Sequence, residues 1–286
     1  MDNLREKFSQ LLEKLADNQI ELRLTEEKNF PAGISKFGGN PDLPKGFEWP
    51  HYNGRPLSFL AQIDLKEAAK YDSRRLLPEN GTLSFFYDIE EQPWGYDPKD
   101  IGCSKVLYFP EGTELVRTSA PDDMPEYCTL DEFRMSLASS ASYPCLSELE
   151  EYAAENGLPF PEYADENEED EVWDSYQEWT EQDVDMTKLL GYSDIVQNPM
   201  REQCEEVAGR GFYLGNGDYS KNLTDEEIAD IKAKRRDWRL LFQLGDDIAE
   251  SIGTMFGDCG NIYFWIRKQD LAERRFDKVW CILQCG

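Results

Sequence analysis

The sequence predicts a mainly β (α+β) protein built around a duplicated β unit, with an N-terminal helix and an acidic central insertion. Three observations predict this fold class. Six segments are rich in β-branched and aromatic residues and bounded by glycine or proline, they form two sets of three near the two ends of the chain, and most of the negative charge lies between the sets. Apolar residues make up 40% and aromatic residues 13% of the 286 residues, a composition typical of a folded chain.

An amphipathic helix is expected over the first 20 residues. Its apolar face consists of Leu4, Phe8, Leu11, Leu12 and Leu15. Asn3 and Glu6 have the spacing of a capping pair. We assign residues 1–29 to this element, whose apolar stripe needs a surface to pack against.

The two sets of strands follow the same order. The expected strands are 57–65, 81–89 and 105–109 in the first set, and 239–244, 260–267 and 278–283 in the second. Aligning them places Gln62 on Gln243, Gly81 on Gly260, and 105–106 on 278–279, with offsets of 181, 179 and 173. Ordered matches with slowly drifting offsets indicate an internal duplication, with repeats at 30–117 and 188–286.

One further helix is expected in the second repeat. It opens with the capping box Thr224-x-x-Glu227 and closes with a group of cations at 232–236. Cations are favourable at a helix C-terminus, so this basic group does not by itself indicate nucleic-acid binding.

The central segment, residues 118–187, carries 21 acids and a single base, Arg134, of a formal net charge of −28 for the whole chain. From residue 148 onward this segment has 16 carboxylates, no cation and six aromatic residues. One interpretation is a surface that steers and anchors a basic partner. The other is an acidic insertion whose rings pack back on the protein. The candidate contact residues are Glu162, Asp165, Glu166, Glu168, Glu169, Asp170, Glu171, Trp173, Asp174, Tyr176 and Trp179.

Catalytic and metal-binding patterns are few. The chain has one histidine, His51, and seven cysteines without a C-x-x-C pair, so a zinc site is not expected. The one Cys-His combination in which glycines expose the thiol is His51 with Cys259. Acids at strand ends, such as Asp64, are expected in a chain with 58 acids, and turn hydrogen bonding accounts for them. We identify no catalytic residue, no metal and no cofactor, and the sequence favours a non-enzymatic role.

Nucleotide and nucleic-acid binding are also disfavoured. The chain lacks a phosphate-binding loop, and its overall charge repels phosphate polymers. The glycine-rich passage that contains Asn216-Gly217-Asp218 lacks the spacing of a calcium loop.

Gln62 and Gln243 are amides within apolar strands, and a buried amide needs hydrogen-bond partners. Neighbouring loops can supply them. The alternative is a ligand site at the seam between the repeats, formed by these two residues with Asp258 and Cys259, in a hydrolase or small-ligand-binding protein.

The start of the chain has no apolar targeting segment, and no apolar run is long enough to cross a bilayer. With an odd number of unpaired cysteines, this pattern is typical of the cytoplasm, and no membrane contact is expected. The sequence does not indicate an oligomeric state.

Several motifs resemble the YwqG-like family, a bacterial domain of unknown function. They are Gly38-Gly39-x-Pro41-x-Leu43-Pro44, Trp49-Pro50, Phe59-Leu60-Ala61-Gln62-Ile63-Asp64, Leu189-Leu190-Gly191-Tyr192 with Ile195 and Gln197, Gly257-Asp258-x-Gly260 leading into 262–265, Val279-Trp280, and Leu283-Gln284-Cys285. The resemblance covers most of the chain outside the acidic segment.

The resemblance implies a mainly β, roll-like fold with internal duplication in one compact domain, and no catalytic residues. Some relatives are encoded among secreted-toxin and immunity genes, which implies a protective, partner-binding role by association. We therefore expect a protein-binding module, with a basic protein such as a toxin as its partner, residues 148–185 as its contact and no direct nucleic-acid binding.

Overall fold

The structure is a computed structural model that describes residues 2–27, 30–163, 165–180, 186–215 and 223–286. Its centre is one ten-stranded antiparallel sheet. In spatial order the strands are β14 (Trp280–Gln284), β13 (Asn261–Arg267), β12 (Trp238–Leu244), β11 (Lys188–Leu190), β1 (Asp17–Thr25), β10 (Phe133–Ser142), β2 (Lys36–Phe37), β6 (Ser58–Asp64), β7 (Thr82–Tyr87) and β8 (Ser104–Phe109). The fold is mainly β and roll-like, as the sequence predicts.

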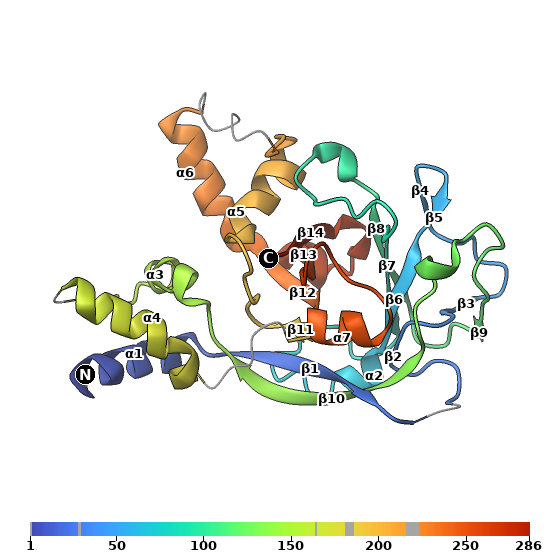
Figure 1. Cartoon of the computed structure of the whole chain (residues 1–286), viewed down its shortest axis with the longest axis horizontal. Coiled ribbons are helices and arrows are strands. Elements are labelled where there is room, and N and C mark those ends of the chain that lie inside the picture. Colours follow the sequence, from blue (N-terminus) through green and yellow to red (C-terminus); the bar gives the residue numbers. More distant parts are fainter. Residues whose placement is uncertain (1, 28–29, 164, 181–185, 216–222) are drawn as a thin grey trace.

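The long pair β1–β10 joins two arms of four strands each (Figure 1). The arms curve toward each other, so the sheet is nearly closed. On the inner face, Phe85 of the first arm meets Phe242 and Phe264 of the second arm, with ring centroids 4.5 and 5.3 Å apart. The seam between the arms is therefore apolar and filled on the inside.

The arms repeat each other in detail. β6 pairs with β7 through a register shift between Phe59 and Ala61, and β12 pairs with β13 through a shift between Leu240 and Phe242. A bulge at the same point of both arms agrees with the duplicated pattern in the sequence. The alignment of the last strands was wrong by two residues, because the register matches Val106 of β8 with Cys281 of β14 rather than with Val279.

Both faces of the arms are covered. In β7 and β13 every residue except Arg267 is buried, since the inner face joins the central core while the outer face packs under loops and short helices. α5 (Met200–Cys204) packs on the outer face of the second arm, and the small strands β3 (Asp42–Pro44), β9 (Leu115–Arg117), β4 (His51–Tyr52) and β5 (Arg55–Pro56) lie on the outer side of the first. The short helices α2 (Leu65–Ala68), α7 (Asp246–Ser251) and α8 (Lys268–Ala272) bury apolar residues in the central core, and α6 (Asp225–Lys234) precedes β12. The capping box predicted at Thr224 and Glu227 is present at the start of α6.

Three helices form a separate unit at one end of the molecule: α1 (Asp2–Leu15), α3 (Leu146–Glu155) and α4 (Glu166–Thr180) (Figure 1). We call this unit the helical subdomain. The expected helix over the first 20 residues is shorter than predicted, because Asp17 already begins β1, in which Ile20 and Leu22 alternate toward the central core. Among the described residues, no helix is long and apolar enough to cross a membrane.

Candidate functional site

Gln62 and Gln243 lie at equivalent places in the two arms and bind equivalent partners. The Gln62 amide nitrogen donates to the Ile34 carbonyl and the Asp42 carboxylate, both at 2.9 Å, and its oxygen accepts from the Asp42 backbone at 2.9 Å. The Gln62 and Gln243 side chains are both fully buried.

In the second arm, the Gln243 amide donates to the Met186 carbonyl at 2.8 Å and to the Asp194 carboxylate at 2.7 Å, while its oxygen accepts from the Asp194 backbone at 3.0 Å. Each glutamine thus uses its side chain to fasten the loop that follows β2 or β11. Gln62 is bound to the segments beside β2 and Gln243 to those beside β11, so each amide belongs to its own arm.

A buried lysine completes each network. Lys36 donates to the Glu132 carboxylate at 2.8 Å and to the Asn40 carbonyl, and Lys188 donates to the Asp194 carboxylate at 2.7 Å. Burial lowers the pKa of Lys36, against the opposing effect of its hydrogen bond with Glu132. These ammonium groups are satisfied internally, which indicates structural anchoring.

Asp42 is equally enclosed. Burial acts to raise its pKa, but hydrogen bonds from Gly33, Arg117 and Gln62 lower it overall. Sequence reasoning missed the two buried lysines and the aspartates that follow them. The signal was available, because Lys36 precedes Asp42 by the same spacing at which Lys188 precedes Asp194.

Asp258 and Cys259 lie in a tight turn before β13, where the Asp258 carbonyl accepts a hydrogen bond from Gly286 at 3.0 Å. Cys259 is exposed, and the carboxylates of Asp246 and Asp258 raise the pKa of its thiol. A raised pKa disfavours the thiolate that a cysteine nucleophile needs. His51 lies in the other arm, and its ring nitrogen Nδ1 is 2.6 Å from the Trp49 carbonyl oxygen.

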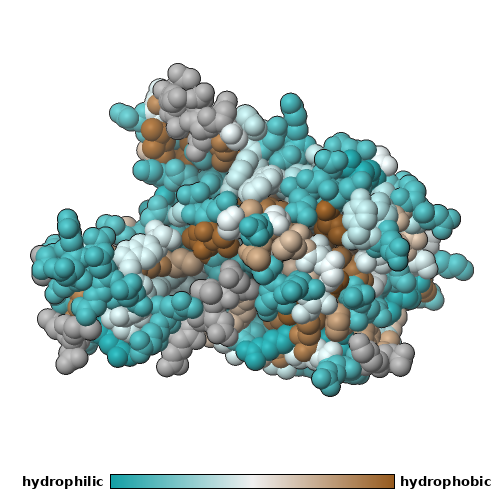
Figure 2. Space-filling view, viewed as in Figure 1, coloured by the Kyte–Doolittle hydropathy of each residue, from teal (hydrophilic) through white to brown (hydrophobic). Residues whose placement is uncertain are grey.

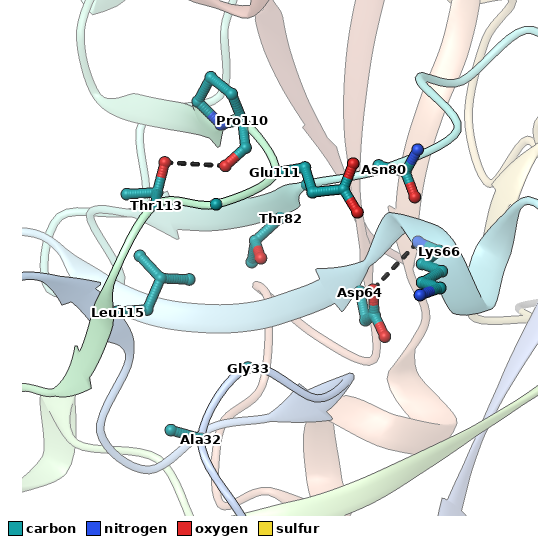
Figure 3. A pocket seen from close by; sticks show the side chains of 12 residues that line it. Ala32, Gly33, Asp64, Lys66, Asn80, Thr82, Pro110, Glu111, Thr113 and Leu115 are labelled. Atoms are coloured by element: carbon teal, nitrogen blue, oxygen red, sulfur yellow. Dashed lines mark hydrogen bonds between the residues drawn. The ribbon is translucent and has the colours of Figure 1, made fainter.

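A shallow pocket of about 300 Å³ opens where β6 ends (Figure 3). Asp64, Lys66 and Glu111 bring their charged groups to one side of it. Asp64 accepts a hydrogen bond from the Lys66 backbone at 3.0 Å and caps α2. This is the turn role expected for a strand-end carboxylate.

The aromatic residues of the acidic segment pack mostly inward, against the apolar stripe of α1. The Phe8 ring lies 5.6 Å from Phe160, 6.0 Å from Tyr163 and 6.0 Å from Trp179. Tyr176 is buried, and its hydroxyl donates to the Pro144 carbonyl at 2.7 Å. The surface that the apolar stripe of α1 needs is therefore supplied by the acidic segment.

Two arginines of the second repeat bind the acids of α3. Arg201 donates to Glu155 at 2.8 Å and stacks on the Tyr152 ring, 3.8 Å from its centroid, while Arg235 donates to Glu151 at 2.7 Å. These bonds attach the helical subdomain to the sheet. They also mean that part of the central negative charge is neutralised internally.

The exposed face of α4 is different. Glu166, Glu169, Asp170, Asp174 and Glu178 recur at helical spacing along it. They surround Trp173, whose side chain is 54% exposed while Tyr176 and Trp179 of the same helix face inward. Figure 2 shows hydrophilic residues over most of the visible face of the helical subdomain. We call the exposed acids of α4 with Trp173 the acidic helix face.

The remaining candidate contact residues have mixed positions. Asp165 accepts hydrogen bonds from the backbones of Asn167 and Glu168 at the start of α4, and Glu162 is exposed in the preceding loop. Glu168 and Glu171 are half-buried. Residues 181–185 of the predicted contact segment, and the loop at 216–218, lie outside the described residues.

A comparison with family models places most of the chain in one family. A family model described as a domain of unknown function (DUF1963) matches residues 35–285. No curated protein matches the chain. The match begins after α1 and includes both arms and the acidic segment.

Proposed function

The chain belongs to this family of unknown function, and from that premise we propose that it is a non-enzymatic protein-binding module whose contact is the acidic helix face. We further place it among the bacterial, YwqG-like members of the family, on the motifs around Gly38-Gly39 and Trp49-Pro50. Its seven free thiols support a cytoplasmic location.

One observation carries the proposal: Trp173 is the exposed aromatic residue of α4, in the middle of a row of carboxylates. Exposed tryptophan is a common anchor in protein interfaces, and its ring attracts cations. Carboxylates around it speed association with a positively charged partner and orient it. The partner that fits is a basic protein surface with an arginine or lysine placed over the ring.

A toxin neutralised by this chain, as an immunity protein, is the partner we favour. A basic nuclease toxin would offer the required positive surface, because such an enzyme binds nucleic acid through cations. The acidic helix face would cover that surface by presenting carboxylates in place of phosphates.

The test compares two triple variants in pull-downs from the native lysate at low and high salt. Asp170→Asn/Trp173→Ala/Asp174→Asn removes the centre of the face. The control, Trp94→Ala/Asp122→Asn/Asp123→Asn, removes a tryptophan that is 42% exposed and two exposed acids elsewhere.

We expect a basic protein to be retained by the wild type and the control, released by salt and lost with the α4 variant. Retention of the basic protein at high salt, or by the α4 variant, would contradict the proposal.

A further inference from the structure

A second surface of the molecule has the opposite charge. A groove of about 460 Å³ lies between the arms, and its lining residues are Arg75, Leu76, Leu77, Pro78, Arg239, Lys268, Leu271, Ala272 and Arg274. Residues 75–78 come from the connection between α2 and β7 in the first arm, and the others come from β12, α8 and the turn after α8 in the second. We call it the basic groove.

Its four cations are Arg75, Arg239, Lys268 and Arg274. In the part of the chain that the structure describes, none of these four side chains forms an ion pair, although the chain has 58 acids and 30 lysines and arginines. Arginines elsewhere, such as Arg201, Arg235 and Arg275, are each held by carboxylates. The Arg239 Nε atom is buried and has no hydrogen-bond partner among the described residues.

The backbone holds two of these arginines in an unfavourable conformation. Arg75 has φ 54° and Arg274 has φ 59°, in the left-handed region that favours glycine. Arg274 also lies over the Tyr108 ring, 5.9 Å from its centroid, and donates to the Tyr108 hydroxyl at 3.5 Å. At Arg274 this conformation ends α8, where the Arg275 backbone N–H donates to the Asp270 carbonyl at 2.8 Å, and it places the Arg274 side chain at the groove.

The positive charges of the basic groove repel one another. Burial lowers the pKa of Lys268, and Arg239 lowers it further, while the more favourable charges of Asp237 and Glu155 only partly offset them. A bound anion would relieve this repulsion, so ligand binding and charge on Lys268 favour each other.

We propose that the basic groove binds a small molecule that carries a di- or triphosphate. Guanidinium groups match phosphate oxygens in pairs, and four cations balance the charge of an oligophosphate better than that of a single carboxylate. Leu76, Leu77 and Leu271 provide an apolar floor for the organic part. The volume lies in the usual range for small-ligand sites. The chain's overall negative charge disfavours a nucleic-acid polymer or an anionic membrane at the same place.

Inorganic pyrophosphate is the probe, with binding to the full chain measured by calorimetry at low salt. Arg239→Gln/Arg274→Gln should weaken binding at least about tenfold, since each lost charge-assisted hydrogen bond contributes that order. Ala272→Glu places a carboxylate at an exposed helical position of the groove, where the fold tolerates it, and should abolish binding. Arg5→Gln/Arg23→Gln, two exposed arginines on α1 and β1, is the matched control and should bind like the wild type.

The proposal fails if the wild type does not bind pyrophosphate, or if the control pair weakens binding as much as the groove pair does. Flotation with phosphatidic-acid vesicles separates the two sources of phosphate. Association with vesicles but not with free pyrophosphate would overturn the proposal that the ligand is a soluble small molecule. None of the groove residues lies on α4, so the pyrophosphate experiment tests the basic groove independently of the proposed protein binding.

Discussion

Gln62 and Gln243 make the same three hydrogen bonds at equivalent positions of the two arms, each to an aspartate that follows a buried lysine by the same spacing. A repeated pattern of apolar residues alone could arise because any two buried strands need apolar side chains. Repetition of a buried polar network, with its loop and its bulge, is much more specific to a duplicated unit. The networks also explain why polar residues are kept inside apolar strands.

Gln62→Ala and Gln243→Ala should each lower the free energy of unfolding by about 2–4 kcal/mol, because each leaves a backbone N–H, a carbonyl and a carboxylate buried without their partner. The two values should be similar, since the partners are equivalent. Urea denaturation measures both. Gln177→Ala, at an exposed position of α4, serves as the control and should change stability by less than about 0.5 kcal/mol. A large difference between the two arms would show that the networks are not energetically equivalent.

Phe8→Ala should unfold the helical subdomain selectively. The Phe8 ring is fully buried and contacts three aromatic residues of the acidic segment, so its loss removes about 3–5 kcal/mol of packing from a small core. Hydrogen exchange should accelerate in α3 and α4, while amides of β7 and β13 stay protected. Ser9→Ala, at the exposed neighbouring position, should leave both regions unchanged. Equal acceleration in the sheet would mean that the subdomain and the arms unfold as one unit.

The strands of both arms could be predicted from the sequence because their apolar and aromatic residues form continuous runs between glycines. β6, β7, β8, β12, β13 and β14 all begin and end within two residues of their expected bounds. The central strands β1 and β10 were missed. β1 follows α1 after a single residue, so its alternating leucines extend the apolar pattern of the helix. β10 has Met135 and Leu137 on its inner face but otherwise consists largely of serine and alanine, which are poor strand signals.

The candidate sites were predictable only in part. Composition located the acidic segment and its aromatic residues, but it could not separate Trp173, which faces solvent, from Tyr176, which faces α1. That distinction depends on where α1 docks, a contact between distant parts of the chain. The basic groove left no local pattern, because Arg75, Arg239 and Arg274 come together only when the two arms close.

Cys259 should be the first cysteine to react with iodoacetamide in the folded protein, because it is exposed and the other six are buried or half-buried. It should react more slowly than free cysteine at pH 8, since Asp246, with Asp258, raises the pKa of its thiol and the thiolate is the reactive form. Asp246→Asn should therefore speed labelling a few-fold, as measured by mass spectrometry over time. Asp277→Asn, an exposed acid of the 3₁₀ turn before β14, is the control. A rate unaffected by Asp246→Asn would show that access, and not charge, limits the reaction.

Glu148 makes stability fall as pH rises. Its carboxyl is fully buried in α3, and its Oε1 lies 3.6 Å from Arg201 Nε, too far for a hydrogen bond. Burial raises its pKa from 4.5 to about 7, the Arg201 charge acts in the opposite direction, and Glu151 and Glu155 reinforce the rise. Below pH 4.5 the group is protonated in both the folded and the unfolded chain. Between pH 4.5 and about 7 the folded chain holds the proton more strongly, so the folded state loses up to about 3 kcal/mol as the group ionises.

Glu148→Gln keeps the shape of the protonated side chain and removes this titration. The variant should match the wild type at pH 5 and exceed its free energy of unfolding at pH 8 by up to about 3 kcal/mol, measured by urea denaturation. Glu150→Gln, at the exposed position two residues later, should follow the wild-type pH dependence. Destabilisation of Glu148→Gln at pH 8 would mean that the ionised carboxylate is held by Arg201 more strongly than burial disfavours it, and the helical subdomain would then be attached through a genuine buried ion pair.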